Sequence, residues 1–385
     1  MQKIEKTKGG KLKIMKYKRY FLTSESVTEG HPDKVCDLIS DSILDECLMQ
    51  DKNSRVAVET MVTGNKIIVA GEVTSNAKLD IEKIVRDALK EVGYDDENTT
   101  MDYRTCEIEQ YIKRQSNDIA IGVDKGGAGD QGLMFGYATD ETESYMPYPI
   151  FLAHKITHRL SEVRKSGEID YIKSDGKAQV TVEYVNDCPI RIDSILISIQ
   201  HLENVNISTL QKDLIEKVIL KVVDSDMLDI ETKFFINPTG RFVIGGAIGD
   251  TGLTGRKIIC DTYGGLARHG GGAFSGKDGT KVDRSASYMA RHIAKNVVAN
   301  GMARRCEIQL SYGIGMKQPI SLFIECFGTN RVPENIIIKA IKERFDLTPE
   351  GIIEYLKLRQ PIYRKTTNYG HFGREGFSWE ELKQI

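Results

Sequence analysis

Hydrophobic and polar positions repeat one arrangement three times along the chain. In each copy, two short stretches rich in β-branched residues alternate as strands do, and a segment with apolar residues three and four positions apart follows. The predicted strand, strand and helix are 55–62, 66–73 and 79–92 in the first copy, 178–185, 190–200 and 209–223 in the second, and 306–312, 320–327 and 333–345 in the third. The short gaps between paired strands favour antiparallel neighbours.

This pattern predicts an α/β protein of the α+β type. The copies start near residues 55, 178 and 306, a spacing far too long for a solenoid. We therefore expect three similar domains, each a mostly antiparallel sheet covered by helices, at 20–126, 127–240 and 241–385. The alternative is that a unit as common as strand–strand–helix recurs by chance.

Charge separates the first residues from the rest of the chain. Residues 1–19 hold eight Lys or Arg and one acid, whereas the whole chain has a net charge of −2, so the remainder is acidic. An acidic body argues against a nucleic-acid-binding surface. We expect a basic, disordered tail at 1–19, with a tether to an anionic surface as the alternative, and Met15 is a second candidate start residue.

Composition indicates a cytoplasmic protein. No apolar stretch approaches the roughly 20 residues that span a bilayer, and no apolar segment of the signal-peptide type opens the chain. The seven cysteines include no Cys-x-x-Cys pair, which favours small buried residues in a reducing cytoplasm over a zinc site.

Glycine is concentrated in one region, where 13 of the 35 glycines fall between Gly240 and Gly279. Dense glycine indicates tight turns or close approach of the backbone to a ligand. We therefore expect residues 241–283, in the third repeat, to contact a ligand and to bind phosphate.

The segment 30–34, Gly-His-Pro-Asp-Lys, precedes a strong apolar helix pattern. Pro32 suits a first helical turn, so His31 and Asp33 are expected at a helix N-terminus, which favours anions. Asp33 could hold a Mg²⁺ ion that bridges phosphates. An ordinary helix cap is the alternative for this motif taken alone.

Two glycine motifs resemble nucleotide-binding loops only in part. Residues 271–278 have the Gly-x-x-x-x-Gly-Lys spacing of a P-loop, but Asp278 stands where a P-loop has Ser or Thr. Residues 127–132 fit Gly-x-Gly-x-x-Gly, but no helix pattern follows, so we interpret them as a turn rather than a dinucleotide-binding fingerprint. Asp175-Gly176-Lys177 and the segment from Asp250 to Lys257 add acids and cations on turns.

Taken together, these motifs resemble those of one family. The chain is similar to S-adenosylmethionine synthetases (methionine adenosyltransferases) in several segments that occur in the same order: 23–26, 30–34, 127–132, 233–238, 271–278 and 369–374. The likeness runs from about Phe21 to Trp379. It implies three similar domains around a pseudo-threefold axis, and synthesis of S-adenosylmethionine from ATP, methionine and water with release of triphosphate, which is then hydrolysed.

The resemblance also implies two Mg²⁺ per site, one K⁺ per subunit, and a homodimer with shared active sites that pairs into a tetramer. It assigns roles by position. The catalytic residues would be His31, Asp130, Lys177, Arg256, Lys277 and Lys281. The ATP contacts would be His31, Asp175, Lys177, Arg241, Phe242, Asp250, Arg256, Lys257, Ala273 and Lys277. The methionine contacts would be Glu72, Gln115, Asp250 and Lys281, and the metal ligands Asp33 and Asp283 for Mg²⁺ and Glu59 for K⁺.

The sequence departs from the family in the loop between Gln115 and Gly129, which is shorter here than in many bacterial members. In the family that loop is the mobile gate of the active site. Two other functions stay open at this point. A phosphotransferase would release ADP, and a non-catalytic ATP-sensing subunit would turn over no substrate.

Overall fold

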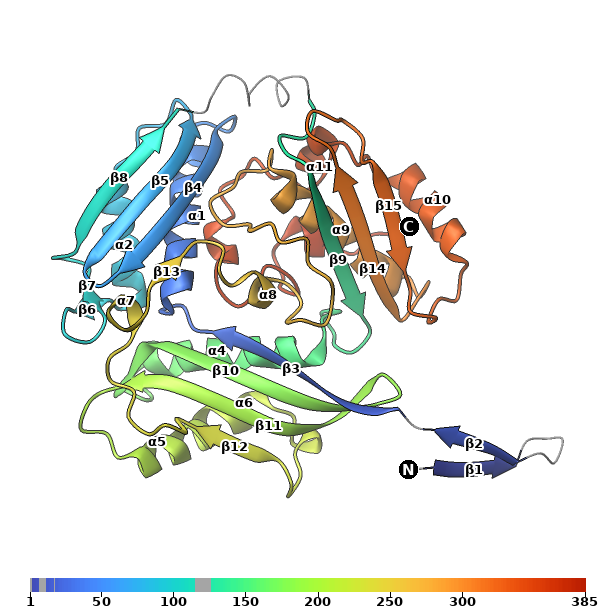
Figure 1. Cartoon of the computed structure of the whole chain (residues 1–385), viewed down its shortest axis with the longest axis horizontal. Coiled ribbons are helices and arrows are strands. Elements are labelled where there is room, and N and C mark those ends of the chain that lie inside the picture. Colours follow the sequence, from blue (N-terminus) through green and yellow to red (C-terminus); the bar gives the residue numbers. More distant parts are fainter. Residues whose placement is uncertain (1, 7–11, 17, 115–125) are drawn as a thin grey trace.

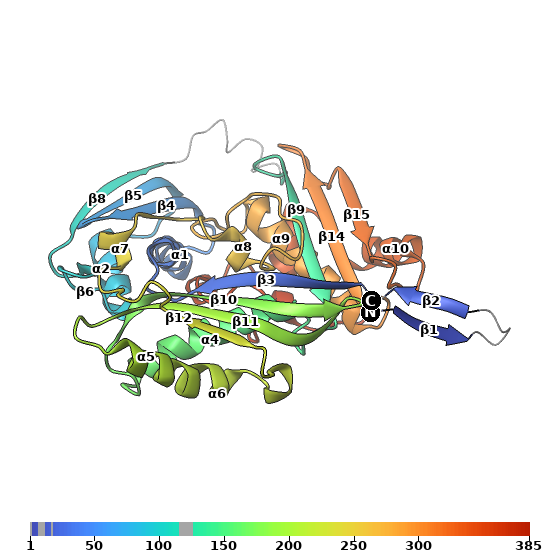
Figure 2. The same cartoon turned by 60° about the horizontal axis from the view of Figure 1, so that its bottom comes forward.

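The computed structural model describes residues 2–6, 12–16, 18–114 and 126–385 of the chain. Figure 1 shows three sheets set around a central group of helices and loops, with a small strand pair projecting beside the N-terminus. Figure 2 shows the same arrangement turned about the horizontal axis. The three sheets are mainly antiparallel, so the predicted fold class is confirmed.

The first sheet has the order β13-β4-β5-β8. Its strands are β13 (Gly252–Leu253), β4 (Arg55–Thr63), β5 (Lys66–Thr74) and β8 (Glu107–Lys113). β4 and β5 pair antiparallel as predicted, and β8 joins β5 in parallel. Alternate residues of β4, such as Val56 and Val58, are buried, because helices α1 (Pro32–Gln50) and α2 (Ile81–Val92) cover that face.

The second sheet has the order β12-β11-β10-β3. Its strands are β12 (Lys233–Ile236), β11 (Cys188–His201), β10 (Ile172–Val185) and β3 (Arg19–Val27). α4 (Tyr148–Lys165) packs on β10 and β3. The helix predicted at 209–223 consists of three pieces, α5 (Ile207–Asp213), the π-helix η1 (Leu214–Ile219) and α6 (Leu220–Val222), and the 3₁₀ turn η2 (Ser225–Met227) follows.

The third sheet has the order β15-β14-β9. Its strands are β15 (Ser321–Glu325), β14 (Arg305–Tyr312) and β9 (Gly132–Thr139). α9 (Val282–Ala299) packs on β9 and β14, α10 (Glu334–Arg344) packs on β15, and α11 (Pro349–Tyr355) packs on α9. Each predicted strand pair with its helix is therefore confirmed, with ends shifted by a few residues.

Each of the three sheets draws a strand from beyond the predicted domain boundaries. β13, from the predicted domain 241–385, joins the first sheet. β3 lies before the first repeat but pairs with β10, with Ser24 opposite Val180. β9 lies between the first two repeats along the chain but pairs with β14, with Gly136 opposite Ile308. The division at 20–126, 127–240 and 241–385 stays a prediction, and the sheets themselves are not contiguous in sequence.

Residues 2–6 and 12–16, predicted to be disordered, form strands β1 (Gln2–Lys6) and β2 (Leu12–Lys16). The two strands are antiparallel, with Ile4 opposite Ile14. The tail predicted at 1–19 stays a prediction, and residues 1, 7–11 and 17 of it lie outside the described residues. The remaining small elements are β6 (Asp95–Asp96), β7 (Met101–Asp102), α7 (Gly246–Gly249), α8 (Ile258–Asp261), η3 (Arg364–Thr366) and η4 (Ser378–Glu380).

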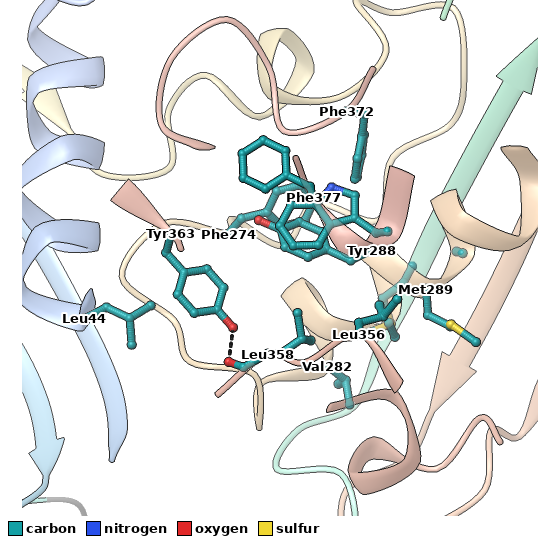
Figure 3. Packing of buried hydrophobic residues seen from close by; sticks show 14 of the residues in the cluster. Leu44, Phe274, Val282, Tyr288, Met289, Leu356, Leu358, Tyr363, Phe372 and Phe377 are labelled. Carbon is teal, nitrogen blue, oxygen red and sulfur yellow. Dashed lines mark hydrogen bonds between the residues drawn. The ribbon is translucent and has the colours of Figure 1, made fainter. Parts of the chain in front are cut away.

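Helices α1 and α9 lie at the centre of the molecule. Both are buried on nearly all sides, so neither shows the single apolar stripe of a surface helix. Figure 3 shows aromatic residues of the C-terminal segment packed beside α9, where Tyr288 and Phe372 lie near Phe274. None of the helices described combines the length and hydropathy needed to cross a bilayer.

Candidate active site

The turn between β3 and α1 forms the base of a pocket. The Thr28 N–H donates to the Gly176 carbonyl of β10 (2.9 Å), and the Tyr94 hydroxyl donates to the Gly30 carbonyl (2.8 Å). Glycine is required at position 30 because a Cβ there would lie 2.3 Å from Ser174 Oγ. These contacts fix the N-terminus of α1 against the second sheet.

His31 caps α1. Its backbone is extended (φ −64°, ψ 133°), as the following proline requires, and its Nδ1 accepts a hydrogen bond from the Asp33 N–H (3.2 Å). Burial, together with Lys257 and Lys177, lowers the pKa of His31 to about 3. The imidazole is therefore neutral at physiological pH, and the hydrogen bond to Nδ1 places its one proton on Nε2.

Asp33 binds the turn that follows β13. Its Oδ1 accepts from the Leu253 N–H (2.9 Å), its Oδ2 pairs with Lys257, and Arg256 Nε lies 4.0 Å from Oδ1. Burial favours the neutral acid, but Lys257 and the Leu253 N–H outweigh burial and lower the pKa of Asp33. The carboxylate consequently stays ionised beside two cations.

A pocket of about 320 Å³ opens beside His31. We name it the α1 pocket, and its lining residues are His31, Asp175, Lys177, Ser198, Phe242, Ile244, Gly245, Gly249 and Asp250. Five of these nine were predicted site residues, and they come from α1, β10 and the segment after β12. Ser198 faces Lys177 across the β10–β11 pair, so the strand register could have identified it.

Asp175 is the most deeply buried carboxyl group of the α1 pocket. Its Oδ2 accepts from the Gly246 N–H (2.8 Å). Burial raises the pKa of Asp175 to about 6, although the Gly246 N–H and Lys177 oppose the shift. The group therefore gains a proton a little below neutral pH.

We expect Asp175→Asn to stabilise the protein at neutral pH. The amide keeps an acceptor for Gly246 but cannot ionise, whereas wild type loses stability as the pH rises from the ordinary pKa of about 3.9 through about 6. The free energy of unfolding, measured in urea near pH 4 and pH 8, should favour the variant by about 2 kcal/mol at the higher pH only. The exposed Asp170→Asn is the control, and an equal effect at both pH values would contradict the prediction.

A second group of predicted residues lies on the glycine-rich loop, which we define as residues 270–279. This loop is attached to the edge of β4, since the Val58 N–H donates to Gly276 O (3.1 Å) and Ala57 bridges to Lys277. Gly276 has φ +80°, and a Cβ there would lie 1.9 Å from Val58 O, so glycine is required. β13 pairs with the other end of the same edge, at Met61 and Val62.

The loop and the start of α9 pair two lysines with two aspartates. Lys277 Nζ lies 2.8 Å from Asp283 Oδ2, and Lys281 Nζ lies 2.5 Å from Asp278 Oδ2. Burial favours the neutral form of Asp278, but Lys281 and nearby hydrogen-bond donors outweigh burial and lower its pKa. The carboxylate of Asp283 also lies beside Gly272, where a Cβ would come within 2.3 Å of it.

The geometry separates this loop from a P-loop. A P-loop helix begins directly after the lysine, whereas here Lys277 continues along the edge of β4 and α9 begins only at Val282. Residues 127–132 lead into β9 rather than a helix, as predicted. Neither motif therefore forms the nucleotide fold that its spacing suggests.

The comparisons with known proteins agree with this geometry. Sequence models of S-adenosylmethionine synthetase match the chain at 19–117 (N-terminal domain), 125–242 (central domain) and 244–381 (C-terminal domain). The chain belongs to the S-adenosylmethionine synthetase family. The S-adenosylmethionine synthase of Clostridium botulinum (strain Alaska E43 / Type E3) is 56% identical over 384 residues, covering 96% of this chain and 98% of that protein. The synthase of Finegoldia magna is 56% identical over 380 residues, covering 94% and 97%.

Not all predicted site residues of this synthetase family member meet in the α1 pocket. Arg241 pairs with Glu203 at the surface (2.9 Å), and Asp130 is exposed, accepting from the adjacent Gln131 N–H. Ala273 lies against Gly255, where a Cβ would come within 2.4 Å. Gln115 and the short loop at 122–125 lie outside the described residues.

Glu59 and Glu72 project from the face of the first sheet that is turned away from α1. Ala57 of β4 pairs with Glu72 of β5 on one side and bridges to Lys277 on the other. Strand β4 therefore lies between Glu72 and the glycine-rich loop. Glu59 shares the face of Ala57, and both glutamates are exposed. Among the described residues, no hydrogen bond or ion pair joins Glu59 or Glu72 to the residues that line the α1 pocket.

Four aspartates of α1 hold the site together, and the sequence analysis identified only the first of them, Asp33. They recur every four residues at Asp33, Asp37, Asp41 and Asp45, and all are buried. The Gly255 N–H donates to Asp37 (2.9 Å) and the Gly276 N–H donates to Asp41 (2.8 Å). One edge of α1 thus anchors both the turn at 253–257 and the glycine-rich loop, and the signal in sequence was the spacing of the acids.

Proposed function

We propose that this protein makes S-adenosylmethionine from ATP, L-methionine and water. The methionine sulfur attacks C5′ of ATP, triphosphate leaves, and the triphosphate is then hydrolysed to pyrophosphate and phosphate. Membership of the family supports the reaction class. The observation that carries the proposal is the α1 pocket, which brings His31 and Lys177 together with Phe242 and Asp250 from distant parts of the chain.

Each group of site residues would bind a different part of the substrates. Lys177, Arg256, Lys257 and Lys277 would bind the triphosphate, Phe242 would pack on adenine, and Asp175, Arg241, Asp250 and Ala273 would complete the ATP contacts. Glu72, Gln115, Asp250 and Lys281 would surround methionine. The product is a sulfonium cation, and acids such as Asp130 would stabilise its positive charge.

The chemistry needs alignment and stabilisation of a leaving group. A thioether has no proton to lose, so no general base is required, and positioning the two reactants can contribute about 7–11 kcal/mol. The leaving triphosphate is strongly anionic, and preorganised cations stabilise such charge best. His31, neutral with its proton on Nε2, would donate a hydrogen bond to the oxygen that separates from C5′.

The donor set fits magnesium. Asp33 and Asp283 are carboxylates at helix N-termini, each now paired with a lysine, and Mg²⁺ commonly uses one or two carboxylates together with substrate phosphates. The part of the chain that the structure describes holds no cluster of three acidic, His or Cys ligands. When bound, two Mg²⁺ would neutralise charge on the triphosphate. Glu59 would hold one K⁺ per subunit.

The decisive experiment is product analysis. Purified protein is incubated with ATP, methionine, Mg²⁺ and K⁺, and the products are identified by mass spectrometry. We expect S-adenosylmethionine with pyrophosphate and phosphate. ADP would indicate a phosphotransferase, and no turnover at saturating substrates would indicate a non-catalytic subunit.

We further propose a homodimer with shared sites, paired into a tetramer, in the reducing cytoplasm. The residues that line the α1 pocket come from outside the glycine-rich loop, and in the proposed dimer the pocket of one subunit would meet the loop of its partner. The exposed face of the first sheet, with Tyr111 57% exposed, offers a surface for that contact. All seven cysteines are free, which supports a reducing compartment.

Mixing two inactive variants should restore activity. In a heterodimer of His31→Asn and Lys277→Ala, one site carries both substitutions and the other carries neither. We therefore expect activity to reappear after subunits exchange, measured as S-adenosylmethionine formed. Heterodimers that form, as shown by differently tagged chains, but stay inactive would place both residues in a site within one subunit.

A further inference from the structure

A second and larger cavity lies on the other side of the turn that carries His31. Its volume is about 820 Å³, within the range of small-molecule sites. One face of α4, the end of α6 and the C-terminal segment 364–374 line it. Glu29 lines this cavity, whereas His31, two residues later, lines the α1 pocket.

The lining of this cavity is positively charged. It has six cations and three carboxylates: Lys155, Arg159, Lys221, Arg364, Lys365 and Arg374 against Glu29, Glu91 and Glu162. Each carboxylate is already neutralised. Glu29 accepts from Arg164 and Lys165 (both 2.6 Å), Glu91 pairs with Arg364, and Glu162 lies 3.3 Å from Arg159.

Three of the cations have no carboxylate partner among the described residues. Arg374 donates only to backbone carbonyls, those of Lys365, Asn368 and Gly370, and burial lowers its pKa, so its charge is poorly compensated. Lys221, on α6, and Lys365, in the C-terminal segment, are exposed and form no ion pair within the described part of the chain. The cavity therefore presents positive charge that the protein itself does not neutralise.

A buried histidine of the cavity lining, His154, lacks a hydrogen-bond partner at one ring nitrogen. His154 is 8% exposed, its Nδ1 lies 2.8 Å from Ser26 Oγ, and its Nε2 has no hydrogen-bond partner. If the serine hydroxyl donates to Nδ1, the proton is on Nε2 and requires an acceptor. Asn368, across the cavity lining, likewise has an unsatisfied Oδ1. Both atoms are inaccessible to solvent, and His154 Nε2 lies against Gly370.

We propose that this cavity binds a small polyanion that carries phosphate groups. Guanidinium and ammonium groups spread over several walls suit a multiply charged anion better than a single carboxylate. The site is separate from the proposed catalytic centre, from which the turn at 28–31 divides it.

Pyrophosphate is the probe for the test. Because the α1 pocket is also expected to bind it, titrations are made in a Lys177→Ala background, by isothermal calorimetry without Mg²⁺. We expect a binding event that becomes about tenfold weaker or more when Lys221→Ala and Lys365→Ala are added. Both lysines are exposed, so their loss should not affect folding, and an unchanged thermal midpoint checks this.

The control adds Lys233→Ala, an exposed lysine on β12 outside the cavity, to the same background. It should leave the pyrophosphate affinity unchanged. Equal affinity in the cavity variant and in the control, or no binding in the Lys177→Ala background, would overturn the proposal.

Discussion

Lys277→Ala should lower kcat/KM by a factor of about 150 or more, equivalent to about 3 kcal/mol of transition-state stabilisation. The lysine sits on a loop whose neighbouring glycine has φ +80° and lies against β4, so its backbone is held in place before substrate binds. Its partner Asp283 is 2.8 Å away and would take up a magnesium ion when the lysine turns to phosphate. Steady-state rates of S-adenosylmethionine formation give the value.

Lys339→Ala is the matched control, because Lys339 lies on α10 and is 71% exposed beside Glu343. A surface lysine of this kind should change neither rate nor stability measurably. Near-normal kcat/KM in Lys277→Ala would remove Lys277 from the site. A loss confined to KM would instead mean that the lysine binds ground state and transition state equally.

The sequence predicts the local elements of this protein well. Alternation in β4 and the three-and-four spacing in α2 are visible because each element meets its sheet or helix within a few tens of residues. The start of α1 at Pro32 follows from proline's fixed φ and its missing N–H, and the structure agrees. Local chemistry was sufficient for these features.

Features that depend on distant partners were not predicted. Nothing in residues 19–27 indicates that β3 pairs with β10 rather than with the first repeat. Arg241 was assigned to ATP by resemblance, but its ion pair with Glu203 is a tertiary contact that no motif encodes. The same holds for Phe242, whose N–H donates to His201 Nε2 at 3.1 Å and so fixes one wall of the pocket.

The aspartates of α1 show most clearly what a sequence pattern does not predict. Acids four residues apart on a helix ordinarily mark a solvated face. Here each finds backbone N–H donors on loops far along the chain, such as Tyr363 N–H for Asp45 (3.0 Å). Burial raises the pKa of Asp45 to about 6 even so. Tertiary structure therefore decides whether a row of acids on a helix faces solvent or binds distant loops.

Asp41→Ala should cost about 3–5 kcal/mol of stability, because it leaves a buried charge without its partner. Arg284 and Asp41 are both 0% exposed and form two parallel hydrogen bonds of 2.7 and 2.8 Å. Asp41 also accepts from the Gly276 N–H, and Arg284 donates to the Phe274 and Lys277 carbonyls (both 3.0 Å). The Asp41–Arg284 pair therefore fixes the backbone of the glycine-rich loop against α1 and α9.

Urea denaturation measures this effect, with Asp80→Ala as the control. Asp80 is the exposed N-cap of α2, and its loss should cost only about 1 kcal/mol. Replacing both partners, Asp41→Leu with Arg284→Met, should cost clearly less than the sum of the two single substitutions, since no unpaired charge remains. If Asp41→Ala were as mild as Asp80→Ala, the ion pair would not be what fixes Lys277, and the loop would owe its position to the edge of β4 alone.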